Sequence, residues 1–410
     1  MIRLNPGYEI YFGKQNQLSL SSNREEIVQL FEKIEKGSGS FLHRFLKQAA
    51  YNYDVAINKV VHKPGKSLRE LVMPETIFRS PQFIYSLHHT VRKNIQDPRL
   101  RQILEFPVLF LGAKPSEIPS FYRFMNYADM ELGTWHIKGG MFMLIKSMQT
   151  VAESLGVKIY PNSPVDKIVT QNQQVTGVLI KDIFHPADVV ISGADYQHTE
   201  SLLEASVRNY KETYWNKKTF APSALLYYIG FNKQVKNVSH HTLFFDTDFD
   251  RHAKAIYDQP DWPEKPLFYA SFPTKTDPAL APDGKEAAII LLPVAAGLAD
   301  TPALREHYFK QVIERMEELT GQSLTDHILF HHSYSVSDFQ RDYHAYKGNA
   351  YGLANTLFQT AFFKPKIYNR KLKNLFYTGQ LTVPGPGVPP ALISGKIAAK
   401  EAISYLRQRA

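Results

Sequence analysis

The sequence predicts a mixed α/β fold with two separate sheets and a helical region, and three patterns in the chain carry this prediction. In the N-terminal third, apolar residues recur every three or four positions, as they do along one face of a helix. The middle of the chain carries short aromatic and β-branched runs between polar loops, which are typical of an antiparallel sheet. Between residues 139 and 195 a helical pattern precedes several strand patterns, an order that favours a parallel sheet.

Composition limits the classes of protein to consider. The 410 residues, of which 44% are hydrophobic, suffice for two or three domains with apolar cores. There is no cysteine, so disulfides, thiolate metal sites and cysteine nucleophiles are excluded, and a cytoplasmic location is expected. The longest apolar stretch, 287–299, is interrupted by Pro293, and the start of the chain has no signal-peptide pattern. We therefore expect a protein that is neither secreted nor membrane-spanning.

The N-terminal segment predicts a hairpin followed by helices. Residues 8–12 and 17–20 form two short strand patterns about a polar turn. Ser22 or Asn23 then opens a first helix, and a second is expected to begin at Ser40.

The stretch 68–111 keeps a helical pattern and is unusually apolar, with basic residues among the apolar ones. It predicts either a buried helical cap or a surface that meets lipid. The residues concerned are Phe78, Phe83, Ile84 and Leu87, with Arg79, Arg92 and Lys93.

The segment that follows predicts a parallel sheet with a small antiparallel appendage. Gly139 and Gly140 precede an apolar helix, which Gly156 ends. The strand patterns after this helix are 157–160, 165–169, 175–180 and 187–195.

A second, mostly antiparallel sheet is expected further along the chain. A helix with start and stop signals follows its first strands, from Thr301 and Pro302 to Leu319, with Gly321 after it. The strand patterns of this sheet are 225–231, 242–245, 266–272, 287–294 and 329–335.

Charge and motif searches point to few partners. The net charge of +9 and the 13% aromatic content suit nucleic acid or an anionic membrane surface, although many soluble enzymes are basic without any such partner. No nucleic-acid motif, P-loop or G-x-S-x-G turn is present in the sequence. We expect no metal site, because Arg251 and Tyr257 occupy required positions of a calcium-like loop that begins at Asp246. The adjacent pairs 240–241 and 331–332 are histidines that would point to opposite faces of a strand.

The most informative segment is 374–395, which reads as a short strand, a Gly/Pro turn and the start of a helix. Gly385 and Gly387 let the backbone approach a ligand closely, and Pro389 and Pro390 suit the first turn of a helix. Free N–H groups and the positive end of the helix dipole would then face an electron-rich ligand. The alternative is a Gly/Pro loop of purely structural importance.

This segment, together with residues 348–366, resembles the C-terminal flavin-contacting signature of the bacterial phytoene desaturases, carotenoid-forming members of the FAD-dependent amine oxidase-like group. Weaker resemblance covers the rest of the chain, including 106–112 and 133–140. The family opens with a strand, a GxGxxG turn and a helix that bind the FAD diphosphate, and the 410 residues contain no such turn. The chain thus resembles a desaturase that lacks its first βαβ unit.

The resemblance implies an incomplete Rossmann-like FAD-binding domain, an antiparallel-sheet substrate domain and a helical cap. Residues 1–20 and 222–345 would form the substrate-binding sheet, and 21–130 the cap that faces a membrane. Residues 131–221 and 346–410 would form the remaining part of the FAD-binding domain.

The activity that the resemblance implies is FAD-dependent desaturation of phytoene or a related long polyene toward lycopene. No side chain accepts two electrons, so a flavin must do so. We expect the 410 residues alone to bind FAD poorly, because the N–H groups of the first helix are the usual partners of the diphosphate. The expected flavin-contacting residues are Gly379, Gln380, Pro384, Gly385, Gly387, Val388 and Pro389, with Val165 at the adenine.

Acid–base residues are less clearly indicated. Asp97 and Arg101 match the family pattern and would serve the proton half of the reaction, although they also suit an ordinary pair on a helix surface. A carotenoid isomerase or a hydroxycarotenoid dehydrogenase on the same scaffold is the alternative enzyme. A non-catalytic remnant or binding module is the alternative from another class.

A hydrocarbon substrate implies an apolar tunnel and a membrane as its source. We expect a peripheral protein on the inner face of the membrane, docked through the apolar stretch that contains Phe83 rather than through the basic run 362–373.

Overall fold

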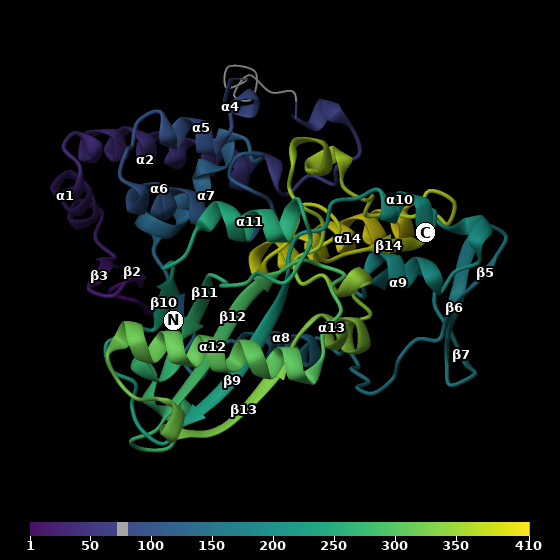
Figure 1. Ribbon diagram of the computed structural model, residues 1–410. Coiled ribbons are helices and arrows are strands. Elements are labelled where there is room, and N and C mark those ends of the chain that lie inside the picture. The colour runs from purple at the N-terminus through teal and green to yellow at the C-terminus, as the bar shows by residue number, and fades with distance from the viewer. Residues whose placement is uncertain (72–80, 410) are drawn as a thin grey trace.

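A seven-stranded sheet is the largest element of the computed structural model, which describes residues 1–71 and 81–409 (Figure 1). Its strand order is β13-β9-β12-β11-β10-β2-β3, and all neighbours are antiparallel except β10 and β2, which run parallel. The predicted, mostly antiparallel sheet is therefore confirmed. The strands are β2 (Tyr8–Gly13), β3 (Asn16–Leu20), β9 (Ser223–Phe231), β10 (His241–Phe244), β11 (Phe268–Ser271), β12 (Glu286–Val294) and β13 (Ile328–Tyr334).

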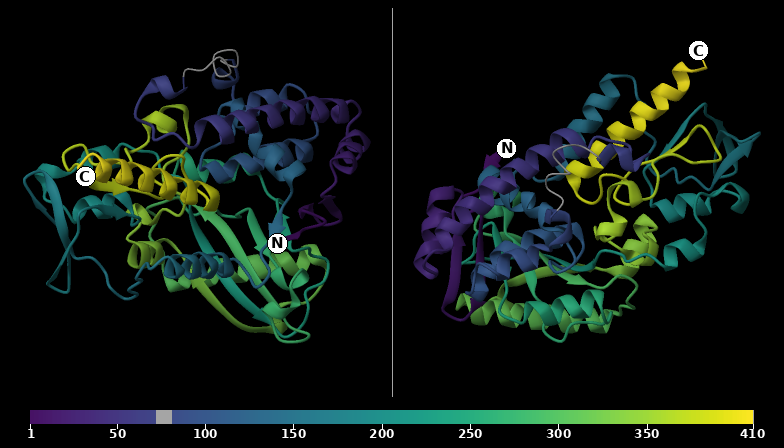
Figure 2. Two further views of the ribbon diagram at one scale, coloured as in Figure 1. Left: turned by 180° about the vertical axis from the view of Figure 1, so that it is seen from behind. Right: turned by 90° about the horizontal axis from the view of Figure 1, so that it is seen from above.

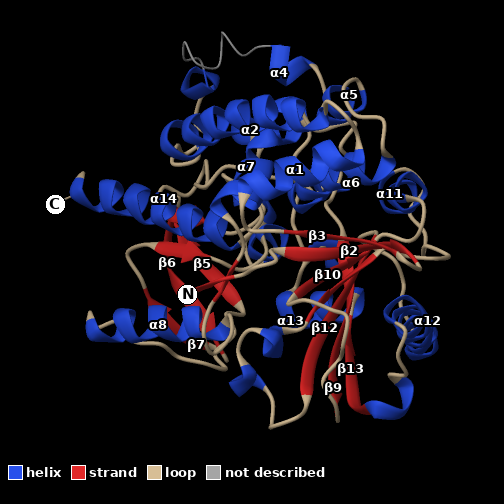
Figure 3. Ribbon diagram, turned by 90° about the vertical axis from the view of Figure 1, so that its left-hand side faces the viewer, coloured by secondary structure: helices blue, strands red, loops and turns tan. Residues whose placement is uncertain are grey.

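Helix α12 (Pro302–Thr320) lies along one face of this sheet (Figures 1 and 3). The Thr301 hydroxyl accepts a hydrogen bond from the backbone N–H of Leu304, and Gly321 ends the helix in the left-handed region, so both predicted end signals are confirmed. The buried side of α12 packs on alternate residues of the strands, which all point to the same face. A short helix, α13 (Val336–Tyr343), follows β13.

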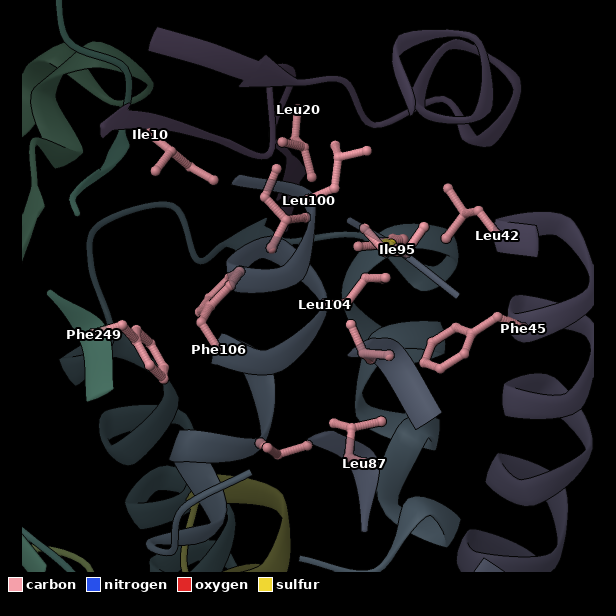
Figure 4. Close-up of a cluster of buried hydrophobic side chains, with 14 of the residues drawn as sticks. Ile10, Leu20, Leu42, Phe45, Leu87, Ile95, Leu100, Leu104, Phe106 and Phe249 are labelled. Atoms are coloured by element: carbon pink, nitrogen blue, oxygen red, sulfur yellow. The ribbon is translucent and has the colours of Figure 1, made fainter. Parts of the chain in front are cut away.

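A layer of helices covers the opposite face near β2 and β10 (Figure 3). Ile10 and Leu20 of the hairpin meet Leu100 and Leu104 in its core, which Figure 4 shows in close-up. The helices of this layer are α1 (Arg24–Ile34), α2 (Ser38–Asp54), α4 (Pro81–Ile84), α5 (Leu87–Arg92), α6 (Pro98–Glu105), α7 (Phe124–Tyr127) and α11 (Phe249–Tyr257). Phe78 and Arg79, named above, lie outside the described residues.

The third part of the molecule contains a parallel pair, β14 beside β8, and a three-stranded antiparallel sheet, β5-β6-β7. The predicted parallel pairing with an antiparallel appendage is confirmed. A buried amide joins the two sheets: Asn374 Nδ2 donates to the carbonyls of Val175 and Asp188, and Asn374 Oδ1 accepts from the N–H of Val175, each at 2.8 Å. The elements are β5 (Lys167–Gln171), β6 (Gln174–Ile180), β7 (Ile183–Pro186), β8 (Val190–Ser192), α9 (Tyr196–Ser201), α10 (Glu212–Asn216), β14 (Leu375–Tyr377) and α14 (Val388–Arg407).

One predicted strand is wrong. Residues 157–160 have no strand pairing, and Val157 and Tyr160 are exposed. A strand needs a neighbour for its backbone N–H and C=O groups, and none of the described residues supplies one here. The preceding helix α8 (Phe142–Ser154) likewise buries none of its residues and leaves an apolar face uncovered (Figures 2 and 3).

A small two-stranded sheet of β1 (Ile2–Arg3) and β4 (Trp135–His136) connects the start of the chain to the segment before α8. Among the described residues, no helix has the length and hydropathy needed to cross a bilayer.

Replacing Gly112 with alanine should destabilise the fold. A Cβ at this position would lie 2.3 Å from the Ala221 Cβ, and φ is +73°. We expect a loss of about 1–3 kcal/mol from the forced displacement, in addition to about 1 kcal/mol from the left-handed backbone. Gly284→Ala is the matched control, because Gly284 has the same φ and no atom within 4 Å of the added Cβ. Urea unfolding of both variants measures the difference, and equal midpoints would show that the close approach at Gly112 is unimportant.

Candidate functional site

The Gly/Pro turn joins the end of β14 to the start of α14. Gly379, Gly385 and Gly387 have φ values of 100°, 135° and 111°, all in the region that L side chains rarely adopt. The backbone takes this path because a parallel strand must turn sharply to place a helix back against the sheet. The structure thus gathers seven of the predicted flavin-contacting residues, from Gly379 to Pro389, in a single turn.

The turn presents unused hydrogen-bond donors. Among the described residues, the backbone N–H groups of Gly385, Gly387 and Val388 find no acceptor, and Gly387 caps α14 without a side-chain hydrogen bond. Pro389 and Pro390 occupy the first turn of the helix, as predicted, so they add no further donors. The positive end of the helix dipole is therefore open to an electron-rich group.

A buried lysine without a partner lies against this turn. The Lys364 side chain is 2% exposed, and neither its Nζ nor the Oδ1 of buried Asn355 has a hydrogen-bond partner among the described residues. A Cβ added to Gly385 would lie 3.3 Å from Lys364 Cε and 3.5 Å from Asn355 Oδ1, so the turn passes close to both side chains. Burial, with a smaller effect from nearby Lys218, lowers the pKa of Lys364 to about 7.

Unpartnered polar atoms of this kind are rare inside proteins, because each costs the free energy of its lost hydration. Lys364 Nζ and the open N–H groups of the turn suit an electron-rich group, and Asn355 Oδ1 suits a hydrogen-bond donor on the same ligand. Sequence reasoning did not assign Lys364 a role in the site. The only sequence signal for Lys364 is its place in the segment 348–366, which resembles the corresponding segment of the phytoene desaturases.

A second feature is an apolar cavity of about 400 Å³ between the large sheet and the helical layer. Aromatic and aliphatic side chains make up most of its wall, and the few polar ones include Asp129, His241 and His252. Its lining residues include Tyr8, Phe106, Leu109, Leu243, Phe245, Phe249, Ile256, Tyr257, Leu267, Tyr269, Leu291 and Tyr351.

The cavity and the turn are neighbours. Tyr351 lines the cavity, and a Cβ added to the adjacent Gly352 would lie 2.9 Å from the carbonyl oxygen of Gln380. The Gln380 side chain also donates to Asn349 Oδ1 at 3.2 Å. The wall of the cavity at Tyr351 is therefore one residue away from a contact with the turn.

The remaining predicted site residues lie elsewhere. Asp97 caps α6 by accepting hydrogen bonds from the N–H groups of Arg99 and Leu100, and its ion pair is with Arg99 rather than Arg101. Arg101 donates to the carbonyl of Ile95 and to the side chain of residue 96. These bonds show that both side chains have local structural partners, and their role in proton transfer stays a prediction.

Val165 lies in the loop that precedes β5, outside any strand. It is on a different element from the turn, and its contact with an adenine stays a prediction.

Comparisons with known proteins agree on one family. Residues 74–403 match the family model of the flavin-containing amine oxidoreductases. The chain is 36% identical over 409 residues to a carotenoid 3,4-desaturase of Haloarcula japonica, covering 98% of this chain and 82% of that protein. It is 27% identical to a zeta-carotene-forming phytoene desaturase of Myxococcus xanthus, covering 99% and 79%. A solved structure of a putrescine oxidase double mutant is similar in fold, with a TM-score of 0.60 at 12% identity, over 99% of this chain and 82% of that one.

Lys364 should make the stability of the chain depend on pH. Its pKa of about 7 in the folded chain lies below the ordinary lysine value of about 10.4, so the unfolded chain binds more protons between these two values. The free energy of unfolding should therefore rise with pH across that window. Lys364→Met should weaken this rise, while Lys396→Met, at an exposed position of α14, should leave it unchanged. Urea midpoints at several pH values measure both slopes, and a Lys364→Met slope equal to that of the unmutated chain would contradict the assignment.

Proposed function

The chain belongs to the carotenoid desaturases of the flavin-containing amine oxidoreductase family, and we propose that it desaturates phytoene or a related long polyene toward lycopene with FAD as its cofactor. The observation that carries this proposal is the apolar cavity that ends beside the Gly/Pro turn. A long hydrocarbon has no polar group to grip, so its binding must come from burial of apolar surface. Small amines would instead require charged or polar partners, which few of the lining residues offer.

The residues of the turn fit a flavin ring. When bound, FAD supplies the two-electron acceptor that no side chain can replace. The N–H groups of Gly385, Gly387 and Val388, together with Lys364 Nζ, would hold the electron-rich edge of the ring, and Asn355 Oδ1 would accept a hydrogen bond from an N–H group of the ring. In the folded chain these donors already point at the same place, so little reorganisation is needed when negative charge develops there.

The diphosphate of FAD needs a further unit, because the 410 residues contain no GxGxxG turn. We infer that the uncovered face of α8 takes up a βαβ unit that carries such a turn. Met141, Phe142 and Ile145 are exposed on this face, and the unpaired segment 157–160 follows directly. An apolar face of this extent is unusual for a surface that stays in water, and a parallel strand beside 157–160 would satisfy its backbone groups.

The protein's own residues also keep water from the reaction. The cavity wall is formed mostly by side chains that offer water few hydrogen bonds, so the part of a polyene held there would meet little water. Asp97 and Arg101 stay the proposed pair for the proton half of the reaction, with the local bonds described above. A dehydrogenase of hydroxylated carotenoids is the second candidate, and the polar pair formed by Asp129 and Tyr8 in the cavity favours it.

We also propose that the protein docks on a membrane surface at the end of the molecule that carries α4. Ile84 and Tyr85 are 78% and 54% exposed there, and exposed Phe358 lies on a segment at the same end (Figures 1 and 2). Leu87, by contrast, is buried in the core, and Phe83 stacks on Phe121, so these two are structural. The alternative basic run 362–373 offers a membrane two fewer lysines than its sequence suggests, because Lys364 and Lys366 are both buried in the fold.

The proposed activity predicts that a side chain at Gly385 abolishes both flavin binding and product formation. Val at this position would meet Lys364 and Asn355 and would resist a φ of +135°. We expect the chain joined to a GxGxxG-containing βαβ unit to hold flavin and to form coloured product in cells that supply phytoene. Gly385→Val and Gly387→Val should do neither, while Gly284→Val, which also has a positive φ but lies away from the turn and from α8, should do both.

Bound flavin is read from the absorbance of purified protein, and products are read from extracted pigments. Stoichiometric flavin on the 410 residues alone would remove the need for the extra unit. Flavin binding without any new conjugated double bond would support the dehydrogenase or isomerase, and no flavin under any condition would support a non-catalytic remnant.

Membrane docking predicts that Ile84→Ser combined with Tyr85→Ser abolishes co-sedimentation with liposomes. Insertion of these side chains into the acyl layer would be lost, while electrostatic attraction alone fades with salt. The control is Val157→Ser with Tyr160→Ser, an equally exposed apolar pair next to α8. Retention by the control and loss by the first variant at high salt would support the assignment. Sedimentation of neither variant nor the unmutated chain would reject docking.

A further inference from the structure

We propose that the apolar cavity has a gated entrance between the end of α11 and the segment that follows the 3-10 helix Phe106–Leu111, and that the ion pair of Lys114 with Asp258 is the latch that holds this entrance closed. This inference rests on the proposed function in one respect, because it takes the cavity to be a site for an apolar molecule. It goes beyond that function by stating where the molecule enters and which bond must break.

The cavity comes close to the surface at the end of α11. Tyr257, the last residue of this helix, lines the cavity, and the side chain of the next residue, Asp258, is 44% exposed. Burial raises the pKa of Tyr257, and smaller contributions come from Glu117 and Tyr351. Tyr257 thus lies between a carboxylate at the surface and another residue of the cavity wall, so its side chain separates the cavity from solvent here.

The latch joins two parts of the cavity wall. Lys114 Nζ lies 2.5 Å from Asp258 Oδ1 and 3.1 Å from Glu117 Oε1. Lys114 follows the 3-10 helix that contributes Leu109 to the wall, and Asp258 follows α11, which contributes Tyr257. The side chains of Asp258 and Glu117 are both accessible to solvent, and ion pairs of this kind add little to stability. The latch can therefore open and close without unfolding of the chain.

The rest of α11 is held firmly, which confines the movement to its C-terminal end. His252 Nδ1 accepts a hydrogen bond from the N–H of Leu267, and its Nε2 lies 2.9 Å from the carbonyl oxygen of Pro293. Phe249, at the start of the helix, is buried in the core of the helical layer (Figure 4). Residues 258–267 form neither helix nor strand, so the chain after Tyr257 can follow a displacement of that residue.

The latch also adjoins the segment that we propose to contact the membrane. Three backbone hydrogen bonds of 2.8–3.1 Å join residues 115–120 to residues 85–88. An apolar molecule that leaves the acyl layer at Ile84 and Tyr85 would therefore find the entrance beside it. An anionic head group would in addition compete with Asp258 for Lys114, so a membrane favours the open latch. The bonded pairs are Ser120 with Tyr85, Leu87 with Ile118, and His88 with Pro115.

The test follows the entry of a neutral apolar dye, N-phenyl-1-naphthylamine, into the full chain by stopped-flow fluorescence. Lys114→Met and Asp258→Ala each break the latch from one side. We expect both variants to raise the association and dissociation rates about 2- to 5-fold, the factor for an exposed ion pair of about 0.4–1 kcal/mol. The affinity should stay unchanged, because the latch lies on the path and not in the site. The double variant should be no faster than either single one.

Arg251→Met is the matched control. Arg251 belongs to the same helix and pairs with Glu264 at 2.5 Å, but this pair does not join α11 to the segment that carries Lys114. Its loss should leave both rates as they are. Sodium chloride at about 1 M should raise the rates of the unmutated chain to those of Lys114→Met and leave the variant unaffected, because salt screens an exposed ion pair.

Three results would overturn the entrance: equal rates in the unmutated chain and both latch variants, an equal increase in Arg251→Met, or a change in affinity with no change in the association rate. Leu291→Trp tests the proposed function separately, because its larger side chain would occupy part of the cavity and should abolish dye binding. Absence of dye binding in the unmutated chain, or binding that survives Leu291→Trp, would overturn the apolar site itself.

Discussion

The position of the Gly/Pro turn depends on the buried amide of Asn374. β14 has only three residues, too few to fix its own register against β8. The three hydrogen bonds of the Asn374 side chain supply the missing constraint, because they tie the residue before β14 to β6 and to Asp188, two residues before β8. An aliphatic side chain would leave the backbone groups of Val175 unsatisfied at about 1–3 kcal/mol each. The position of the start of α14, and of the open N–H groups there, therefore depends on Asn374.

Local signals in the sequence were enough to predict those helices and strands whose own residues mark where they begin and end. Thr301 and Gly321 bound α12, and the aromatic and β-branched runs predicted five strands of the large sheet, because period and end signals are properties of a few neighbouring residues. The strand expected at 157–160 failed for the opposite reason. Its pattern is that of a strand, but strand structure requires a second segment, and pattern alone does not reveal whether one is present.

The candidate site likewise contains residues that could be predicted from local sequence and residues that could not. The turn could be predicted because glycine and proline act on their own backbone. Lys364 and Asp129 could not, because their importance comes from what surrounds them: one lies buried beside a turn 21 residues later, and the other pairs with a tyrosine 121 residues earlier. Apolar binding gives little directionality, so a cavity for a long chain needs a few polar contacts to set its register. Such contacts are single residues scattered through the sequence, and no spacing marks them.

The unpartnered ammonium of Lys364 has a consequence for the life of the protein in the cell. Without a ligand at the turn, Lys364 Nζ and Asn355 Oδ1 have lost their hydration and gained no hydrogen bond in its place. The unliganded chain should therefore open locally more often than the liganded one. A ligand that binds only the folded state shifts this balance by mass action, and proteases act on whatever fraction is open. The amount of enzyme that survives would then follow the supply of flavin, which makes vitamin availability a control on protein abundance as well as on turnover.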